Sequence, residues 1–385
     1  MDLHPTPVNS HPQAPPPRCR LDISAHALRN NVTVIRRALP AGTRLISVVK
    51  ANAYGLGVQD VVTLLREEGT DFFGVANVTE AREIREMVPR ADILLLSAIL
   101  PDEDPWVARL NLLPTVSSAE EVARLRTTAR EIGRPLRVHA KIDTGMGRLG
   151  VWHEKADALL EALSETPEIH TTGLYTHFYD SGDDREGTEN QRKRFLQATA
   201  AFRSRRPDLC LHADNSGGLF SFPGVPFNAA RCGLLHYGIA PGGLCGGPLW
   251  ESLQPVVSVS TNLTLIKTLP WGAGISYGHS HRLARETRVG VLSLGYADGI
   301  PRSCSNRGTV LLRGRACPMI GNVTMDEIMV DLTDVPDAAC GDEAVLIGTQ
   351  GEKTITIETY AERARTIPWE SLCCFSRRMP RFWQD

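Results

Sequence analysis

The sequence predicts an α/β protein in two parts, a (β/α)8 TIM-type barrel followed by a C-terminal all-β domain. Short apolar runs alternate with helix-like segments over roughly two hundred residues, which is typical of parallel strands joined by helices. After residue 250 the runs become β-rich, with Gly and Pro between them and no intervening helices. A chain of 385 residues also exceeds the size at which a single core stops growing.

The chain begins with a segment that is rich in proline. Residues 1–17 hold six prolines among polar residues, a composition that cannot bury enough apolar surface to offset the entropy of ordering. We therefore expect a disordered tail at 1–17, the barrel at 18–250 and the β domain at 251–385. The linker between the two domains is expected between Gly242 and Pro255.

The expected barrel strands are apolar runs, each followed by a helix-like segment. They are LISVV, FFGVA, DILLLS, LPTV, LRVHAKI, IHTTGLYTH and LCLHAD. The helix after LPTV is the most clearly marked, because Ser118 and Glu121 have capping-box spacing and Gly133 suits a helix end. The expected strands of the β domain are VVSVSTNLTLIKTL, RVGVLSL, GTVLLRG, EIMVDLT and EAVLIG.

Composition excludes several classes of function. The formal charge of −2 leaves no basic excess for binding nucleic acid, and no apolar stretch reaches the roughly 18 residues of a membrane helix. The N-terminus lacks the apolar region of a signal peptide, so we expect a soluble, cytoplasmic protein. Nine cysteines without CxxC spacing indicate reduced thiols. His279 and His281 form the one close histidine pair, and we expect no metal.

Several reactive residues follow the apolar runs, and the carboxyl ends of barrel strands are where catalytic groups gather. They are Lys50, Arg148, His177, Asn215, Ser216 and Arg231. Each has an ordinary alternative: a lysine at a strand end is more often a solvated charge, a histidine a core residue, and an asparagine a helix cap. Their convergence at one end of the predicted barrel favours a site.

Two of the strings indicate a cofactor. VVKANAYGLG places Lys50 at a strand end and Tyr54 four residues later, followed by two glycines. Lys50 fits a lysine that forms a Schiff base, and Tyr54 fits a hydroxyl donor to an anion. DNSGG supplies Ser216 and backbone donors for a phosphate. A lysine beside a phosphate cradle indicates pyridoxal phosphate.

The chain resembles the bacterial alanine racemases. The motifs that carry the resemblance follow the family order from residue 18 to the C-terminus, and they are VVKANAYG, KIDTGMGRLG, YTHF, HADNS, the segment from Arg231 to Pro241, ISYG, LGYADG, GNVTMDEIMVD and SRRMPR. The resemblance implies an isomerase that interconverts L- and D-alanine for cell-wall peptidoglycan. It also implies a head-to-tail homodimer whose active sites take residues from both chains.

By resemblance, Lys50 carries pyridoxal 5'-phosphate, and Tyr54, Ser216 and the backbone near Gly233 and Leu234 hold its phosphate. The remaining implied roles concern the ring and the substrate. Arg231 faces the pyridine nitrogen, His177 and Asn215 lie beside the cofactor, and Arg148 holds the reacting group and is oriented by Lys141, which is carbamylated in many members. Tyr277, Met325 and Asp326 are expected from the partner chain, and Tyr296 is expected to line the access channel.

A racemase needs an acid/base group on each face of the substrate carbon, because a fixed single group returns the proton to the side it came from. Lys50 serves one face and Tyr277 the other in the implied mechanism. A tyrosine with a pKa of about 10 is a poor base, so we expect His177 and Arg231 to lower that value. An arginine at the pyridine nitrogen leaves this nitrogen unprotonated and disfavours a long-lived carbanion.

Three positions depart from the family pattern. Thr324 replaces a common cysteine, Leu56 replaces a frequent histidine, and Trp369 stands where a tyrosine usually contacts the phosphate. The indole has one N–H donor and more volume than the phenol. A serine or broad-specificity racemase therefore stays open as an alternative.

Two other classes share parts of this pattern. The related decarboxylases pair a glutamate with the pyridine nitrogen, so Arg231 argues against them. A single-domain pyridoxal-phosphate homeostasis protein would lack the predicted β domain with Tyr277, Met325 and Asp326.

Overall fold

The structure is a computed structural model that describes residues 16–221, 227–240 and 248–385 of the chain. Most of the expected tail, and residues 241–247 of the expected linker, lie outside the described residues. The chain forms two compact units. The barrel unit holds Ile23–Val257, Pro368–Cys373 and Trp383–Asp385, and the β unit holds Ser258–Ile367, Cys374–Phe382 and the described residues up to Asp22.

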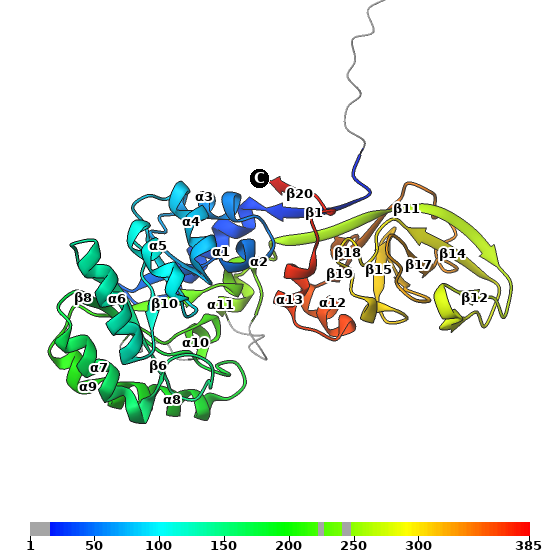
Figure 1. Cartoon of the computed structure of the whole chain (residues 1–385). Coiled ribbons are helices and arrows are strands. Elements are labelled where there is room, and N and C mark those ends of the chain that lie inside the picture. The colour runs from blue at the N-terminus through cyan, green and yellow to red at the C-terminus, as the bar shows by residue number, and fades with distance from the viewer. Residues whose placement is uncertain (1–15, 222–226, 241–247) are drawn as a thin grey trace, which may run out of the picture. The chain divides into compact units, whose positions relative to one another are not determined.

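Among the described residues, eight parallel strands in chain order form the ring of the barrel unit, which confirms the predicted fold. The barrel unit is drawn in Figure 1. They are β2 (Arg44–Val48), β3 (Phe72–Val75), β4 (Asp92–Leu95), β5 (Thr115–Val116), β6 (Leu136–Asp143), β8 (Ile169–Tyr175), β9 (Cys210–His212) and β10 (Ala229–Cys232). The ring closes because β10 pairs with β2. A parallel bridge between Leu94 and Leu113 links β4 to β5, and Arg231 N–H donates to Asp214 O at 2.9 Å beside β9.

Helices lie between the barrel strands, and others precede the first of these strands or follow the last. They are α1 (Ala25–Ala38), α3 (Val58–Glu67), α4 (Val78–Met87), α5 (Asp104–Arg109), α6 (Ala119–Glu131), α7 (Ala156–Glu165), α8 (Arg185–Ala198), α9 (Ala200–Ser204), α10 (Ser216–Ser221), α11 (Pro248–Glu251) and α13 (Pro368–Cys374). The predicted start of α6 is confirmed, since Ser118 Oγ accepts a hydrogen bond from Glu121 N–H. The helix ends two residues before Gly133, which has φ +68°.

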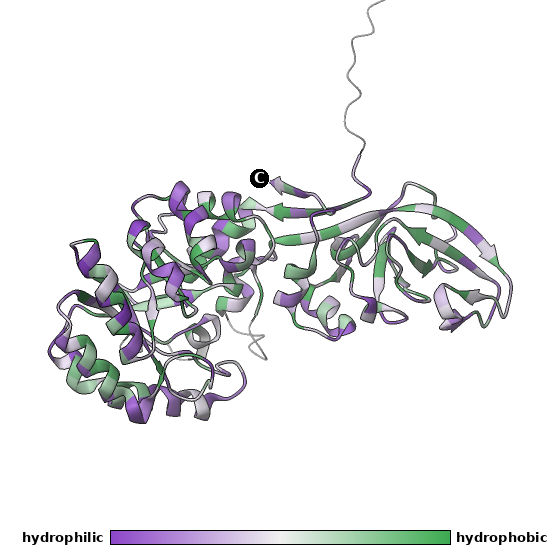
Figure 2. Cartoon of the chain, viewed as in Figure 1, coloured by the Kyte–Doolittle hydropathy of each residue, from purple (hydrophilic) through white to green (hydrophobic). Residues whose placement is uncertain are grey.

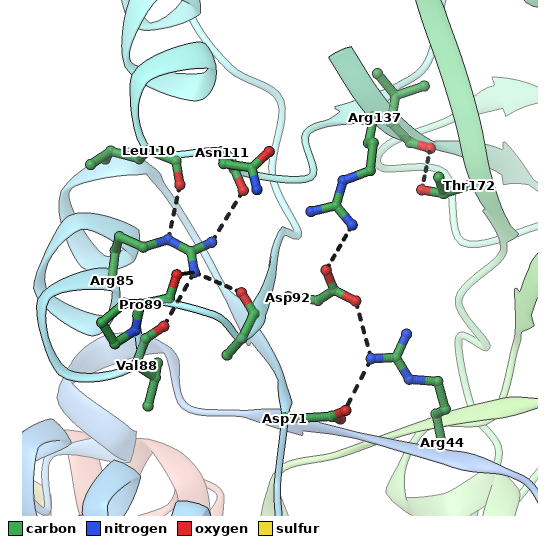
Figure 3. Close-up of polar contacts among 12 residues, drawn as sticks. Arg44, Asp71, Arg85, Val88, Pro89, Asp92, Leu110, Asn111, Arg137 and Thr172 are labelled. Carbon is green, nitrogen blue, oxygen red and sulfur yellow. Dashed lines mark hydrogen bonds and ion pairs between the residues drawn. The ribbon is translucent and has the colours of Figure 1, made fainter. Parts of the chain in front are cut away.

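The barrel interior is apolar at its centre and charged near the amino ends of its strands. The fully buried side chains of Ile46, Phe72 and Leu94 pack against one another in the apolar part. Asp92 accepts hydrogen bonds from Arg44 at 3.1 Å and from Arg137 at 2.9 Å, so one carboxylate ties together the starts of β2, β4 and β6 (Figure 3). Desolvation of Asp92 opposes its ionisation, but the two guanidinium groups outweigh it and hold the pKa of this carboxyl below its ordinary value.

A second cluster in Figure 3 fixes the loops after α4 and α5. The Arg85 guanidinium donates to the backbone carbonyls of Val88, Pro89, Ala91, Leu110 and Asn111. Backbone carbonyls in loops otherwise need water or a neighbouring strand. One side chain therefore satisfies five of them.

The β unit is built on a nine-stranded sheet. Its strands are β1 (Cys19–Ser24), β11 (Val257–Leu269), β14 (Thr287–Leu292), β15 (Thr309–Leu312), β16 (Arg315–Pro318), β17 (Ile328–Asp331), β18 (Glu343–Gln350), β19 (Lys353–Ile355) and β20 (Arg381–Gln384). A separate hairpin pairs β12 (Gly274–Ile275) with β13 (His281–Arg282). Helix α12 (Ile357–Ala364) is an addition that the strand pattern did not indicate.

Short elements complete the described part of the chain, and some of them carry residues of the predicted site. These are the turn α2 (Lys50–Tyr54), β7 (Val151–Trp152) and the 3-10 helices η1 (Pro101–Glu103), η2 (His153–Lys155), η3 (Leu234–Tyr237), η4 (Tyr277–His279) and η5 (Arg302–Cys304). The helices of the barrel unit carry hydrophobic and hydrophilic residues together, as Figure 2 shows. Among the described residues, no helix has the length and apolar character to cross a membrane.

Candidate active site

A cavity of about 650 Å³ lies at the carboxyl ends of the barrel strands, within the barrel unit. Eleven of the residues singled out in the sequence line it. They are Lys50, Tyr54, Lys141, Arg148, His177, Asn215, Ser216, Arg231, Gly233, Leu234 and Trp369. The fold thus brings together residues that are up to 319 positions apart in the chain, from Lys50 to Trp369.

Lys50 directly precedes a left-handed turn. Ala51, Asn52, Ala53 and Tyr54 all have φ between 53° and 56°, although none of them is glycine. An L-residue in this conformation costs roughly 1–2 kcal/mol, so a run of four persists only when the surroundings hold it. Backbone bonds span the turn, from Ala53 N–H to Val49 O at 3.0 Å and from Gly55 N–H to Ala51 O at 2.9 Å.

The end of this turn requires glycine. Gly55 has φ +86°, and a Cβ atom built on it would lie 2.7 Å from the carbonyl oxygen of Leu372. Ala53 and Leu56 are fully buried on either side of it. The strained turn is therefore anchored by packing on both sides, and the Lys50 side chain is left exposed to the cavity.

The candidate phosphate pocket gathers around Gly233. A Cβ atom at Gly233 would lie 2.4 Å from the Tyr54 hydroxyl, so glycine is needed for this close approach. Gly233 N–H donates to Ser216 Oγ at 3.3 Å, which leaves the proton of the Ser216 hydroxyl available to another acceptor. Asn215 Oδ1 accepts from Gly218 N–H at 2.9 Å and so caps α10. It also accepts from Ser181 Oγ at 2.6 Å.

Arg231 is fixed by a dense set of acceptors. Its NH1 group donates to His212 Nδ1 at 2.6 Å, and its NH2 group donates to the carbonyls of Thr176 and Ala213, both at 2.9 Å. The imidazole of His177 is a second ring beside this guanidinium, with Nδ1 3.3 Å from NH2. These hydrogen bonds use both terminal nitrogens, and no acceptor for Nε is found among the described residues. A guanidinium only donates, so the neutral His212 ring carries its proton on Nε2, 2.9 Å from His139 Nδ1.

His177 is an uncharged member of the cavity lining. Burial holds its pKa well below the ordinary value, and the charge of Arg231 lowers it further. The imidazole is therefore neutral near pH 7. Of the two residues expected to act on Tyr277, His177 can do so through hydrogen bonds, whereas Arg231 carries the positive charge.

Lys141 is a buried amine among other cations. Burial lowers its pKa to about 7, with further lowering by Arg231 and Arg148. Its Nζ lies 5.1 Å from the centre of the Tyr175 ring, and Cζ of Arg231 lies 5.2 Å from the same ring. Lys141 was expected to orient Arg148. Among the described residues, the unmodified lysine makes no hydrogen bond to Arg148, although both line the cavity.

Two loops around the cavity are shaped by buried polar groups. Asp143 Oδ1 accepts from the N–H groups of Gly145 and Gly147, at 2.9 and 3.2 Å, and so sets the loop that carries Arg148. Gln191 of α8 is fully buried. It donates to Thr144 Oγ1 and His177 O and accepts from Tyr179 N–H at 3.0 Å. This single amide joins the loops after β6 and β8.

The other predicted residues belong to the β unit, and none of them lines this cavity. Tyr277 begins η4 with a side chain that is 74% exposed, and its carbonyl accepts from Asn322 Nδ2 at 2.6 Å. Tyr296 N–H donates to Thr324 O at 2.9 Å, beside the exposed Met325. The remaining residue, Asp326, pairs with Arg378 at 2.8 Å.

Sequence reasoning missed the residues that support the site. Tyr175 stacks on His212 with ring centres 4.5 Å apart, and its hydroxyl lies 2.7 Å from Thr115 Oγ1. Gln191 and Glu80 were also missed. Tyr175 and His212 do fall at the ends of the expected strands, which is the signal that could have found them. The helical residues carried no comparable signal.

Three possible metal ligands also meet near this site. The side chains of His139, Cys210 and His212 place one ligand atom each within 4.8 Å of one another. Burial lowers the pKa of His139 most, and Arg44, Arg137 and Arg231 lower it further against the opposing charge of Asp92, so three cations face this cluster. His212 is already engaged by Arg231. A dication would have to displace this hydrogen bond in a positive field, and the prediction of no metal stands as an expectation.

Comparison with known proteins decides the family. A model described as the alanine racemase N-terminal domain matches residues 23–241, and one described as the alanine racemase C-terminal domain matches residues 256–383. The chain belongs to the alanine racemase family. The resemblance seen in the motifs is thereby confirmed.

Individual relatives span nearly the whole chain. An alanine racemase from Methylacidiphilum infernorum is 38% identical, over 92% of this chain and 89% of its own length. One from a Nostoc species is 36% identical, over 94% and 95%. A crystal structure of alanine racemase from E. faecalis matches with a TM-score of 0.88 and 33% identity, over 96% and 98%. Another from Bartonella henselae, with covalently bound pyridoxal phosphate, gives 0.87 and 27%, over 96% and 100%.

The donor set of the cavity fits pyridoxal phosphate. Two hydroxyl groups and a glycine without side-chain bulk meet at one point, as a phosphate requires. Lys50 supplies the amine for covalent attachment, and its pKa is lowered by burial first and by Arg148 second. A deprotonated amine is the nucleophilic form.

Proposed function

We propose that the protein interconverts L- and D-alanine with pyridoxal 5'-phosphate as cofactor. The observation that carries the proposal is the placement of Lys50 in one cavity with Arg231, Arg148 and the Tyr54–Ser216–Gly233 cluster. Family membership and the Bartonella henselae relative with its bound cofactor support it.

Several residues would hold the cofactor. Lys50 would carry it, and Tyr54, Ser216 and the backbone of Gly233 and Leu234 would bind its phosphate. Beside the ring, Arg231 would pair with the nitrogen through Nε, which its other contacts leave available, and His177 and Asn215 would flank it. Trp369 would close the same wall of the cavity. The cofactor supplies an electron sink that acidifies the α-hydrogen of the bound amino acid.

The chain's own residues would bind the substrate and move protons. Arg148 would bind the substrate carboxylate, because it lines the cavity as a side chain without a described anionic partner. Lys50 Nζ would hold or release the proton on one face of the α-carbon. Its lowered pKa favours the neutral amine, which is the form that accepts a proton.

A second acid/base group must serve the other face. We infer that it is Tyr277 of the partner subunit in a homodimer, with Met325 and Asp326 beside it and Tyr296 along the access path. The exposed position of Tyr277 in a unit other than that of Lys50 supports this assignment. Arg231 would supply positive charge to the site, because His177 is neutral.

Lys141 would complete the substrate side as a carbamate. An unmodified ammonium there repels Arg148, which is part of the reason for its lowered pKa. The neutral amine that prevails above about pH 7 can add carbon dioxide, forming an N–C bond and releasing one proton. The resulting negative group would attract and orient Arg148. We also propose a cytoplasmic location, which the reduced thiols favour.

Incubation with L-alanine in deuterated water tests the function. Exchange of the α-hydrogen with growth of D-alanine is the expected result. Release of carbon dioxide would indicate a decarboxylase, and the absence of any reaction would indicate a binding protein. Broad-specificity or serine racemisation is the second candidate, favoured by Trp369 in the cavity wall. A panel of L-amino acids assayed for their D-isomers separates it from alanine specificity.

A further inference from the structure

Glu80 is a first-turn residue of α4 whose carboxylate does not cap its own helix in the usual way. Asn77 is the N-cap, and its Oδ1 accepts from Glu80 N–H at 3.0 Å. In a capping box the third helical residue would reach back to the N–H of the N-cap. Glu80 instead accepts from Ala76 N–H at 2.8 Å and from Ala51 N–H at 2.9 Å.

These two donors lie at the ends of neighbouring barrel strands. Ala76 follows β3, and Ala51 follows Lys50 after β2. Ala51 is also the first residue of the left-handed turn, and the first N–H groups of a helical turn have no partner within the turn. Glu80 therefore supplies the acceptor for the leading donor of the strained segment, and it links this donor to the adjacent strand.

The same carboxylate acts on the charge of the amine. Burial and the positive charge of Arg148 lower the pKa of Lys50, and Glu80 is the largest opposing influence, ahead of Cys373. The contact with Ala51 brings this negative charge to the residue next to Lys50. One side chain is thus connected to the lysine by geometry and by electrostatics.

We propose that Glu80 is a positioning residue for Lys50, which holds the left-handed turn in place and keeps a compensating negative charge beside the amine. The catalytic meaning of this role rests on the function proposed above. A second contact assists the turn, since Asn52 Oδ1 accepts from Val58 N–H at 2.8 Å. That contact is uncharged, so the electrostatic part belongs to Glu80.

Two readouts in the full-length protein test the proposal. The first is amide hydrogen exchange of the segment 49–57 in the holoenzyme. The second is the pH dependence of Lys50 acetylation, followed by mass spectrometry after hydroxylamine has removed the cofactor. Glu80→Gln preserves the shape but presents an amide N–H₂ to one of the two N–H donors. Glu80→Asp keeps the charge on a shorter side chain. Glu83→Gln is the control, because Glu83 is exposed on the same helix.

Glu80→Gln should speed exchange at Ala51 roughly tenfold, the factor that corresponds to one hydrogen bond of about 1.4 kcal/mol. It should also shift the acetylation midpoint of Lys50 to lower pH, since the negative charge that favours the ammonium is gone. Glu80→Asp should speed exchange but shift the midpoint less, and Glu83→Gln should change neither.

An unchanged midpoint and unchanged exchange in Glu80→Gln would overturn the proposal. So would equal shifts in Glu80→Gln and Glu83→Gln, because the effect would then reflect net charge alone. Neither readout depends on turnover. If the wild-type protein fails to racemise alanine while the Glu80 effects are found, the proposed function fails and the positioning of Lys50 stands.

Discussion

Asp214 is a carboxyl group buried behind the cavity wall. Its Oδ1 has no hydrogen-bond partner within the part of the chain that the structure describes. Burial raises its pKa to about 6, against the lowering effects of Arg231 and Arg192. A folded-state pKa above the unfolded value means that the folded protein binds the proton more tightly. Protonation of Asp214 therefore stabilises the folded state. This contribution is complete below about pH 4 and is lost as pH rises through 6.

Asp214→Asn should therefore stabilise the protein at high pH. At pH 8 the wild type buries a carboxylate with an unpaired oxygen, whereas the amide is neutral, so we expect a gain on the order of 2 kcal/mol in the free energy of unfolding. Near pH 4 the gain should vanish. Urea unfolding at both values measures it. Asp208→Asn is the control, because Asp208 is exposed, and a gain that does not vary with pH would contradict the account.

Trp369 is expected to limit the size of the substrate. Its indole lines the cavity and replaces a rotatable hydroxyl donor by one fixed N–H with more volume. We expect alanine to be preferred over serine in the wild type, and Trp369→Ala to admit serine and to weaken cofactor binding. A pocket of this kind discriminates by roughly 1–3 kcal/mol against one extra group.

The measurement is the ratio of kcat/KM for alanine to that for serine in the wild type, Trp369→Tyr and Trp369→Ala. Trp369→Tyr should keep alanine as the best substrate and bind the cofactor modestly more tightly. A wild type that prefers serine, or an unchanged ratio in Trp369→Ala, would leave the broad-specificity alternative.

The residues that could be predicted are those whose place in the fold follows from their position at the end of a strand. Lys50 and His177 follow apolar runs, and parallel strands bring such residues to one edge regardless of their distance in the chain. Their charge states could not be predicted in the same way. His177 is neutral because of burial and the proximity of Arg231, and both depend on packing across the barrel.

At the scale of elements, the left-handed turn shows where local sequence is insufficient. The usual signals for positive φ are glycine and asparagine. In the letters KANAY only Asn52 is such a residue, so the sequence does not indicate a run of four. The conformation is imposed by Glu80, by Asn52 and by the close approach of Leu372 to Gly55. In contrast, α6 carries its own start and stop signals, and it was predicted correctly.

Helix α8 positions two loops through Gln191. Replacing Gln191 with methionine keeps the volume but leaves the buried Thr144 Oγ1 and the part-buried Tyr179 N–H and His177 O without this partner. Unpaired buried groups cost roughly 1–3 kcal/mol each, so we expect a loss of stability on that scale. Amide exchange should rise in the loops after β6 and β8 together, because the same side chain holds both.

Gln197→Met on the same helix is the matched control, since Gln197 is exposed. It should leave both loops and the unfolding free energy unchanged. Faster exchange in one loop alone in Gln191→Met would show that the two loops are held independently.

At the scale of the whole molecule, the β sheet takes strands from both ends of the chain. β1 and β20 join the sheet built around β11 and β18. Local alternation of apolar residues indicates a strand but not its partner, so this long-range pairing was not accessible from the sequence. The separation into a barrel and a β-rich part was accessible, because no α-helix lies between the described strands from β11 to β19.

The proposed two-chain active site makes a quantitative prediction for mixed subunits. Lys50→Ala removes one proposed acid/base group and Tyr277→Phe the other, so each homodimer should be inactive. A dimer containing one chain of each kind has one site with both defects and one site with neither. Random mixing makes half of the dimers mixed, so we expect about a quarter of the wild-type activity to return.

The alternative arrangement predicts a different number. If Lys50 acted with Tyr277 of its own chain, every site in the mixed dimer would contain one defect, and no activity would return. Subunit exchange must be shown separately, by native mass spectrometry of the mixed sample. The double variant mixed with wild type is the complementary control: its mixed dimers should have one defect in each site under the shared arrangement and one intact site under the other. Because wild-type dimers remain in the second mixture, full exchange of equal amounts should leave about a quarter of the wild-type activity under the shared arrangement and about half under the other. Return of activity in the first mixture together with a fall to about a quarter in the second would assign Tyr277 to the partner subunit.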